Sequence, residues 1–321
     1  MIPLHPLALA AVEAVALAFV VFTVAAYVIL AERRIIGRMQ ARVGPDRVGP
    51  LGIFQPLADV IKLLTKEDVQ PAGAAAWLHR VTPIVTLVPV MLVFAVIPIT
   101  RGWQLADLNV GYLYVAAISS IGVYGVALGG WGSNSKYALL GGLRSSAQLI
   151  SYELAQGLAV LGVVAATGSL SLVRITEAQQ PLPFIVAQPI GFVVYLIASI
   201  AEASRAPFDL PEAEQELGAG YHTEYSAFRF ALFMLSEYLH VVAAAALVTV
   251  LYLGGWLPFD GGPLGAAAFA LKMGALVFLF IWLRATLPRV RYDRLMAFGW
   301  KVLIPLALVN LAVVAAWIAL Q

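Results

Sequence analysis

The 321-residue chain contains no cysteine, and only 12% of its residues are charged. Without cysteine, the chain forms no disulfide and holds no zinc ion or iron–sulfur cluster through thiolate ligands. Soluble domains carry about 25% charged residues, so the low charge excludes an ordinary soluble protein. Hydrophobic residues make up 61% of the sequence, and the mean hydropathy is +0.89. The composition therefore indicates an integral membrane protein.

The sequence also lacks the usual signatures of nucleotide and redox sites. It has no Gly-rich phosphate loop ending in Lys and Ser or Thr, and no strand followed by Gly-x-Gly-x-x-Gly and a helix. We find no haem-ligand pattern and no paired nucleophile and base. We therefore expect no redox centre, no bound cofactor and no nucleic-acid partner for this chain.

Long apolar runs predict an all-α fold of about eight transmembrane helices, in a single membrane domain over residues 1–321. A span needs about 20 apolar residues, and the Pro and Gly that interrupt several runs are tolerated inside membrane helices. The first run is too long for a signal-peptide core and follows no Lys or Arg, so we expect it to be retained. The predicted spans are residues 7–30, 82–100, 112–131, 147–168, 185–202, 230–253, 264–286 and 302–320.

The distribution of cations gives the orientation. Eight spans place both termini on one side of the membrane and the odd-numbered connections on the other. Of the 20 Lys and Arg residues, all but Arg101, Arg174 and Lys272 lie in or beside the odd connections. The positive-inside rule therefore predicts cytoplasmic odd connections and both termini outside.

The first cytoplasmic connection, residues 31–81, contains an amphipathic pattern. Apolar residues recur at helical spacing opposite charged ones, and Pro56 suits a first helical turn. We predict a short helix that lies on the membrane surface or under a partner subunit, with an interfacial helix devoid of chemistry as the simpler interpretation. The apolar positions are Leu57, Val60, Ile61 and Leu64.

The cytoplasmic connection at residues 203–229 is unusually acidic. Five of the chain's 18 acidic residues fall within 202–216. Crowded like charges raise one another's pKa values, and ionisable groups beside a bilayer often mark an ion or proton path. The alternative is a solvated acidic loop, although Phe208 and Leu210 favour a loop folded against apolar surface. The charged residues of this acidic segment are Glu202, Arg205, Asp209, Glu212, Glu214 and Glu216.

Two glutamates lie inside the cytoplasmic halves of predicted spans. Glu153 and Glu237 each lie about two turns inside the cytoplasmic end, at a depth of roughly 10 Å. An acid within a span costs about 2.5–3.5 kcal/mol on insertion scales. A proton relay that continues inward from the acidic loop explains them, and pairing with Arg144 or Arg229 is the structural alternative.

Other isolated polar residues in the spans give weaker indications of function. Glu13 and Lys272 lie near the outer interface, where snorkelling accounts for them. Glu237 and His240 have the Glu-x-x-His spacing of di-iron bundles, but such sites need two copies and two further carboxylates. Only one copy occurs, so we expect no metal site.

Four long segments closely resemble a known family. The sequence AERRIIGRMQARVGPDRVGP at 31–50 opens the first connection, and residues 137–153 run from YALLGGLR to ISYE. Residues 202–238 include the acidic segment and SEY, and PRVRYDRLM stands at 288–296. Together these segments resemble the H-subunit family of NADH–quinone oxidoreductase, or respiratory complex I. The family includes the first mitochondrially encoded membrane subunit.

The resemblance implies a membrane subunit that forms the membrane part of a quinone chamber and links quinone reduction to proton translocation. It implies quinone as substrate, FMN and iron–sulfur clusters in partner subunits, and a multi-pass location in a bacterial inner membrane. Other complex I subunits would be the partners, namely hydrophilic quinone-site subunits and small membrane-arm subunits. The implied chamber residues are Arg33, Arg42, Glu202, Arg205, Asp209, Phe230 and Phe233. The implied proton path comprises Glu153, Glu212, Glu214, Glu216, Glu224 and Glu237.

Two alternatives of other classes stay open on the sequence alone. Buried acids also suit a stand-alone cation/proton antiporter, and a related membrane-bound hydrogenase would contain an equivalent subunit. The sequence of this chain does not name the electron donor, because the donor site would lie on other chains.

Overall fold

The structure is a computed structural model that describes the backbone of residues 4–209, 218 and 220–320, and the side chains from residue 8 onward within these ranges. Every regular element in these ranges is a helix, which confirms the all-α prediction. Seven helical segments are long and apolar enough to cross a membrane. They are α1 (Leu4–Met39), α3 (Ala76–Val93), α4 (Gly111–Gly132), α5 (Lys136–Thr167), α10 (Ala227–Tyr252), α11 (Gly262–Thr286), and the run Tyr292–Ala319 that joins α12 (Tyr292–Phe298) to α13 (Ile304–Ala319).

The fifth predicted span is broken. Its residues form α7 (Phe184–Ala187) and α8 (Pro189–Glu202), which meet at Gln188, where the backbone leaves the helical region. Pro189 starts the second helix because proline fits the first helical turn. At 14 residues, α8 is only about 21 Å long, shorter than the roughly 30 Å hydrocarbon core. Glu202 therefore ends α8 in the interior of the molecule.

Several helix boundaries differ from the predicted ones. α1 ends at Met39 rather than 30, so its last turns carry basic residues instead of apolar ones. α3 begins at Ala76 and ends at Val93, where residues 82–100 were expected. α5 begins at Lys136 rather than 147. Hydropathy marks where a helix is apolar, whereas hydrogen bonding continues the helix through neighbouring polar residues.

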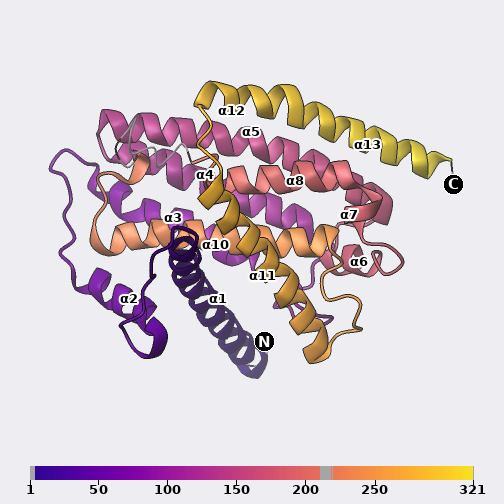
Figure 1. The fold of residues 1–321 in the computed structure, drawn as a ribbon, viewed down its shortest axis with the longest axis horizontal. Helices are drawn as coiled ribbons and strands as arrows, with labels where there is room; N and C mark the ends of the chain where they lie inside the picture. The colour runs from indigo at the N-terminus through magenta and orange to yellow at the C-terminus, as the bar shows by residue number, and fades with distance from the viewer. Residues whose placement is uncertain (1–3, 210–217, 219, 321) are drawn as a thin grey trace.

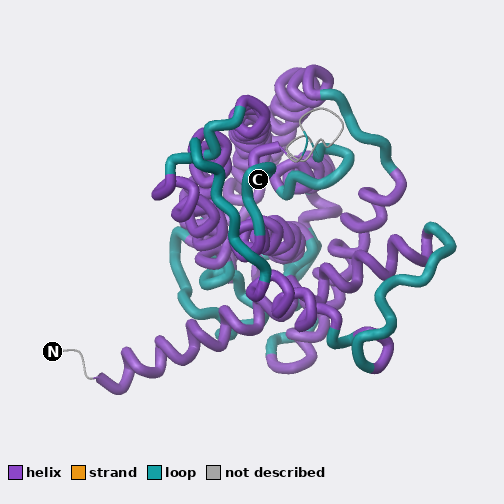
Figure 2. Tube along the Cα trace, turned by 90° about the vertical axis from the view of Figure 1, so that its left-hand side faces the viewer, coloured by secondary structure: helices purple, strands orange, loops and turns teal. Residues whose placement is uncertain are grey.

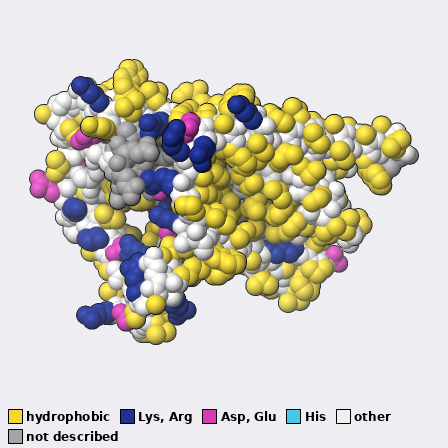
Figure 3. Space-filling model, turned by 45° about the horizontal axis from the view of Figure 1, so that its top comes forward, with side chains coloured by type: hydrophobic (Ala, Val, Ile, Leu, Met, Phe, Trp, Pro, Cys, Tyr) yellow, Lys and Arg dark blue, Asp and Glu magenta, His cyan; other side chains and the backbone are white. Residues whose placement is uncertain are grey.

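α10 lies in the middle of the bundle, and α1, α3, α8 and α11 pack against it (Figure 1). The N-terminal half of α1 extends away from the other helices (Figure 2), and Val12, Val15 and Phe19 are exposed along it. Hydrophobic side chains cover much of the surface, whereas Lys and Arg side chains gather toward one end (Figure 3). This division is typical of a helix bundle whose apolar flanks face lipid.

The predicted amphipathic helix is present as α2 (Gln55–Thr65), with Pro56 in its first turn. The chain that follows α2 forms a hydrogen bond and an ion pair with residues at the start of α10. Val69 donates its N–H to Ser226 Oγ (2.8 Å), and Asp68 pairs with Arg229 (2.9 Å). Arg229 also donates to Nδ1 of His79 (2.7 Å). These contacts join the connection between α1 and α3 to the end of the acidic connection.

Lys272 is engaged more specifically than snorkelling implies. Its ammonium group donates hydrogen bonds to the carbonyl oxygens of Leu253 (2.7 Å), Gly255 (3.0 Å) and Leu257 (2.6 Å). These carbonyls belong to the connection between α10 and α11, so the lysine fixes the path of the chain there.

Close packing of α3 on α4 depends on a glycine. A Cβ at Gly125 would lie 2.2 Å from Thr86 Oγ1 and 2.8 Å from the Thr86 backbone nitrogen. We expect Gly125→Ala to separate the two helices and to destabilise the protein by about 1–3 kcal/mol, as overpacking does. Thermal inactivation of the detergent-solubilised assembly would measure the loss.

Gly274→Ala is the matched control, because a Cβ at that helical position meets nothing within 4 Å. Its midpoint should stay unchanged or rise, since alanine favours the helix by about 1 kcal/mol. Equal thermal midpoints for Gly125→Ala and Gly274→Ala would contradict the close approach of α3 and α4.

Candidate functional site

A buried ion pair joins the acidic connection to α10. Arg205 NH2 lies 3.4 Å from Glu237 Oε2, and both side chains are less than a tenth exposed. Tyr221 donates its hydroxyl to Glu237 Oε1 (3.1 Å), and the Arg205 guanidinium stands 4.2 Å from the centre of the Tyr238 ring. Glu237 is thus paired with a cation of the acidic connection rather than with Arg229.

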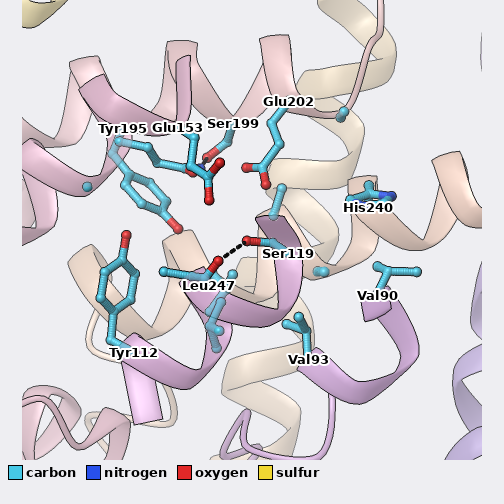
Figure 4. Close-up of a pocket in the computed structure, with 17 residues that line it drawn as sticks. Val90, Val93, Tyr112, Ser119, Glu153, Tyr195, Ser199, Glu202, His240 and Leu247 are labelled. Carbon is cyan, nitrogen blue, oxygen red and sulfur yellow. Dashed lines mark hydrogen bonds between the residues drawn. The ribbon is translucent and has the colours of Figure 1, made fainter. Parts of the chain in front are cut away.

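Glu153 and Glu202 face a common internal space (Figure 4). Ser120 donates a short hydrogen bond to Glu153. Because α5 begins earlier than predicted, Glu153 is 17 residues, or about 26 Å, from the start of its helix. Glu237 is ten residues into α10, about 15 Å.

Two small cavities connect these acids. The first has a volume of about 60 Å³ and extends to Tyr112 and Tyr195, whereas the second, of about 40 Å³, extends to Glu237 and Tyr221. A water molecule needs about 10–15 Å³ of such volume together with polar partners, so each cavity is large enough for water. Five residues line both cavities, namely Ser119, Glu153, Glu202, Ala203 and His240.

Other predicted residues of the acidic connection lie at its edges. Asp209 pairs with Arg289 of the last connection (3.0 Å). Glu224 is half-buried, and its carbonyl oxygen accepts from His79 Nε2 (3.3 Å). Glu212, Glu214 and Glu216 lie outside the described residues.

The predicted aromatic residues belong to a cluster at the start of α10. Phe233 is buried against Tyr221 and Tyr225, with ring centres 5.3 and 4.8 Å apart, and Phe230 contacts His222 (5.4 Å). Burial raises the pKa of the Tyr225 phenol, which therefore stays neutral and hydrogen-bonds Thr82 (2.8 Å).

The predicted arginines of α1 and its connection do not join this cluster. Arg42 is exposed and donates to Gln40 (2.8 Å). Arg33 pairs with Asp59 of α2 (2.7 Å) and lines an apolar groove between α1, α2 and α10. The groove has a volume of about 190 Å³. Its apolar lining includes Leu30, Pro56, Val60, Leu64, Ala231 and Leu235.

The groove and His240 are the parts of the site that sequence reasoning missed. The amphipathic pattern of α2 showed an apolar face but not what lay opposite it. His240 was considered only as a metal ligand, and no group of three or more His, Asp or Glu is placed to hold a metal within the described ranges.

Comparison with known proteins identifies the family. A family model described as NADH dehydrogenase matches residues 12–315. The H subunit of NADH-quinone oxidoreductase from Syntrophotalea carbinolica is 54% identical over 309 residues, which cover 93% of this chain and 92% of the relative. An H subunit from Geobacter metallireducens is 54% identical over 314 residues, with 94% and 93% covered. The H subunit from Geobacillus kaustophilus is 54% identical over 310 residues, with 95% and 92% covered.

The chain belongs to the NADH dehydrogenase family. The resemblance drawn from the four sequence segments is therefore confirmed. In this family member, the acids of α5, α8 and α10 and the groove beside α2 are separate parts of the same bundle.

The Arg205–Glu237 pair generates a stability prediction. Removing one partner of a buried pair leaves an uncompensated charge and costs about 3–5 kcal/mol, so Arg205→Met should strongly lower the thermal midpoint of the solubilised assembly. The double variant Arg205→Met/Glu237→Gln should recover a large part of that loss, because the remaining group is neutral.

Arg101→Met is the control for this pair. Arg101 lies 3.2 Å from Glu177, but its side chain is 71% exposed, and such pairs contribute about 0–1 kcal/mol. A double variant no more stable than Arg205→Met would show that Arg205 acts through packing rather than through the charge of Glu237.

Proposed function

We propose that this chain is the membrane subunit of a proton-pumping NADH–quinone oxidoreductase at which quinone chemistry and proton movement meet. Its partners are other complex I subunits, and those that adjoin the quinone hold the FMN and iron–sulfur clusters that deliver electrons. The bacterial relatives support a location in a bacterial inner membrane. The observation that carries the proposal is the combination of an apolar groove between α1, α2 and α10 with internal carboxylates connected by water-sized cavities.

The groove suits the isoprenoid tail of a quinone. Tails of this kind are apolar and lipid-soluble, and the groove is lined mainly by apolar side chains of α1, α2 and α10. The Arg33–Asp59 pair lies at the same groove and supplies its charged rim. A quinone that enters from the lipid between these helices keeps its tail in an apolar environment.

Quinone reduction consumes protons, and this demand drives the proposed coupling. Protons drawn from acids near the headgroup leave negative charge in a region of low dielectric, where charges interact strongly. Reprotonation then proceeds from the acids farther inside, Glu202, Glu153 and Glu237. The aromatic cluster of Phe230 and Phe233 packs beside this path, and the acidic segment that contains Glu212, Glu214 and Glu216 belongs to the proposed entrance.

A groove-filling variant tests quinone access. Ala231→Trp should fill the groove and raise the KM for a long-tailed quinone about tenfold, equivalent to about 1.4 kcal/mol of binding. The KM for a short-chain quinone should change little, because such a quinone has no tail to place. Quinone-dependent NADH oxidation by membranes measures both.

Leu271→Trp is the control, since Leu271 is 77% exposed on α11 and does not line the groove. Equal effects of Ala231→Trp on long-tailed and short-chain quinones would argue against tail binding in the groove.

Neutral variants test the proton path and thereby the proposed function. Glu153→Gln and Glu237→Gln should each lower proton uptake per electron, and turnover should fall at least about tenfold, because a positioned proton carrier contributes about 10²–10⁴ in rate. Inverted membrane vesicles allow proton uptake and NADH oxidation to be measured together. Glu13→Gln, at an exposed position of α1, should leave both unchanged. Wild-type pumping and turnover in both glutamine variants would refute the relay.

A further inference from the structure

His240 stands at the boundary between the two internal cavities. Of the five residues that line both cavities, three are titratable, and each comes from a different helix. Glu153 belongs to α5, Glu202 to α8 and His240 to α10. We call this set of three the acid–imidazole junction. Any proton that moves between the Glu237 side and the Tyr112–Tyr195 side passes the junction.

The imidazole is held in one tautomer by its own helix. Nδ1 lies 2.8 Å from the carbonyl oxygen of Ser236, one turn earlier in α10. A carbonyl oxygen only accepts, so Nδ1 carries a hydrogen and donates it. The second nitrogen, Nε2, is consequently the basic atom of the ring, and the ring lines both cavities.

Among the described residues, the groups around His240 are acids and phenols, with no second imidazole. The titratable groups that line the same cavities are Glu153 from α5, Glu202 from α8, Glu237 from α10, and the phenols of Tyr112, Tyr195 and Tyr221. The nearby parts of α3 and α4 otherwise contribute neutral groups, including Val90, Thr86 and Ser119. Beyond His240, the helix is apolar from Val241 to Val248, so His240 is the last titratable side chain of α10 before the apolar core.

The junction has an electrostatic reason to hold a proton. Two carboxylates that share one small cavity resist ionising together. A cation between them relieves the repulsion, and imidazole is the side chain that exchanges a proton most readily near neutral pH. The ring also lines both cavities together with Glu153 and Glu202, a placement that the hydrogen bond to the Ser236 carbonyl does not require.

We propose that His240 is a proton-transfer residue of this subunit, a role that rests on the proposed function. Nε2 accepts a proton from water or from the carboxyl group of Glu237 in the second cavity, and the ring becomes an imidazolium. The ring then releases that proton to the carboxylate of Glu153 or Glu202 and returns to its neutral form. The Nδ1–H remains on the Ser236 carbonyl throughout, and no electrons are exchanged.

Two isosteric variants test the proposal in the assembled complex. In His240→Asn the amide nitrogen can still donate to the Ser236 carbonyl, whereas in His240→Gln it approaches the position of Nε2. Neither side chain takes up a proton near neutral pH. We expect both to assemble, to retain NADH oxidation with an artificial acceptor that bypasses quinone, and to lower quinone-linked proton uptake and turnover at least about tenfold.

The pH profile separates proton transfer from a structural role. The wild-type profile of turnover should contain a limb that depends on His240, and both variants should lose that limb rather than merely scale the whole curve down. His79→Asn is the control, since both His79 nitrogens are engaged outside the junction, with Arg229 and the Glu224 carbonyl. It should alter stability but keep the wild-type profile shape and proton uptake per electron.

Comparison with Glu153→Gln distinguishes the proposed role of His240 from the proposed carboxylate relay on which it rests. Wild-type pumping in both His240 variants, together with loss in Glu153→Gln, would overturn the role of His240 and leave the relay intact. Wild-type pumping in all three variants would overturn the relay and the role of His240 together. If the His240 variants lowered turnover equally at every pH and kept the shape of the wild-type pH profile, proton transfer by His240 would also be overturned.

Discussion

The apolar setting of the bundle requires its polar groups to find partners within the protein. Gln179 illustrates this requirement, because its amide donates to the carbonyls of Ile175 and Val250 and accepts from the N–H groups of Phe184 and Gly254. One side chain thereby fixes α6 (Leu172–Glu177), the start of α7 and the end of α10. An unsatisfied group in hydrocarbon costs several kcal/mol. The irregular segments at either end of α10 persist because such side chains satisfy their backbone groups.

The same requirement positions the functional carboxylates. Gln148 of α5 donates to the carbonyls of Ala201 (2.8 Å) and Phe208 (2.9 Å), on either side of Arg205. α8 can therefore end early and inside the bundle, with its terminal backbone satisfied by a neighbouring helix. This early end places Glu202 opposite Glu153, and it leads the chain back so that Arg205 reaches Glu237. A full-length fifth span would carry the acidic segment away from α10.

Periodicity and charge predicted the parts of the fold that depend on local sequence. Seven of the eight predicted spans, the all-α class and α2 follow from apolar runs and from Pro56, because these signals act within one or two turns. The partners of the acids could not be predicted from these local signals. Arg229 is eight residues from Glu237, yet Arg205 pairs with it across 32 positions of sequence, since lateral helix packing decides which groups meet. The position of His240 between two cavities likewise depends on five helices at once, so spacing within one helix did not reveal it.

The acids of this bundle are compensated in two different ways, and the difference bears on how protons move. Glu237 faces the guanidinium of Arg205, which does not lose its proton in proteins. Glu153 and Glu202 instead share their cavity with Ser119 and His240, and Ser120 donates a hydrogen bond to Glu153. The positive charge beside Glu237 is therefore permanent, whereas a positive charge at the junction depends on whether His240 carries a second proton. In the proposed mechanism, uptake and release of that proton by His240 change the electrostatic environment of Glu153 and Glu202, while the charge of Arg205 beside Glu237 stays constant.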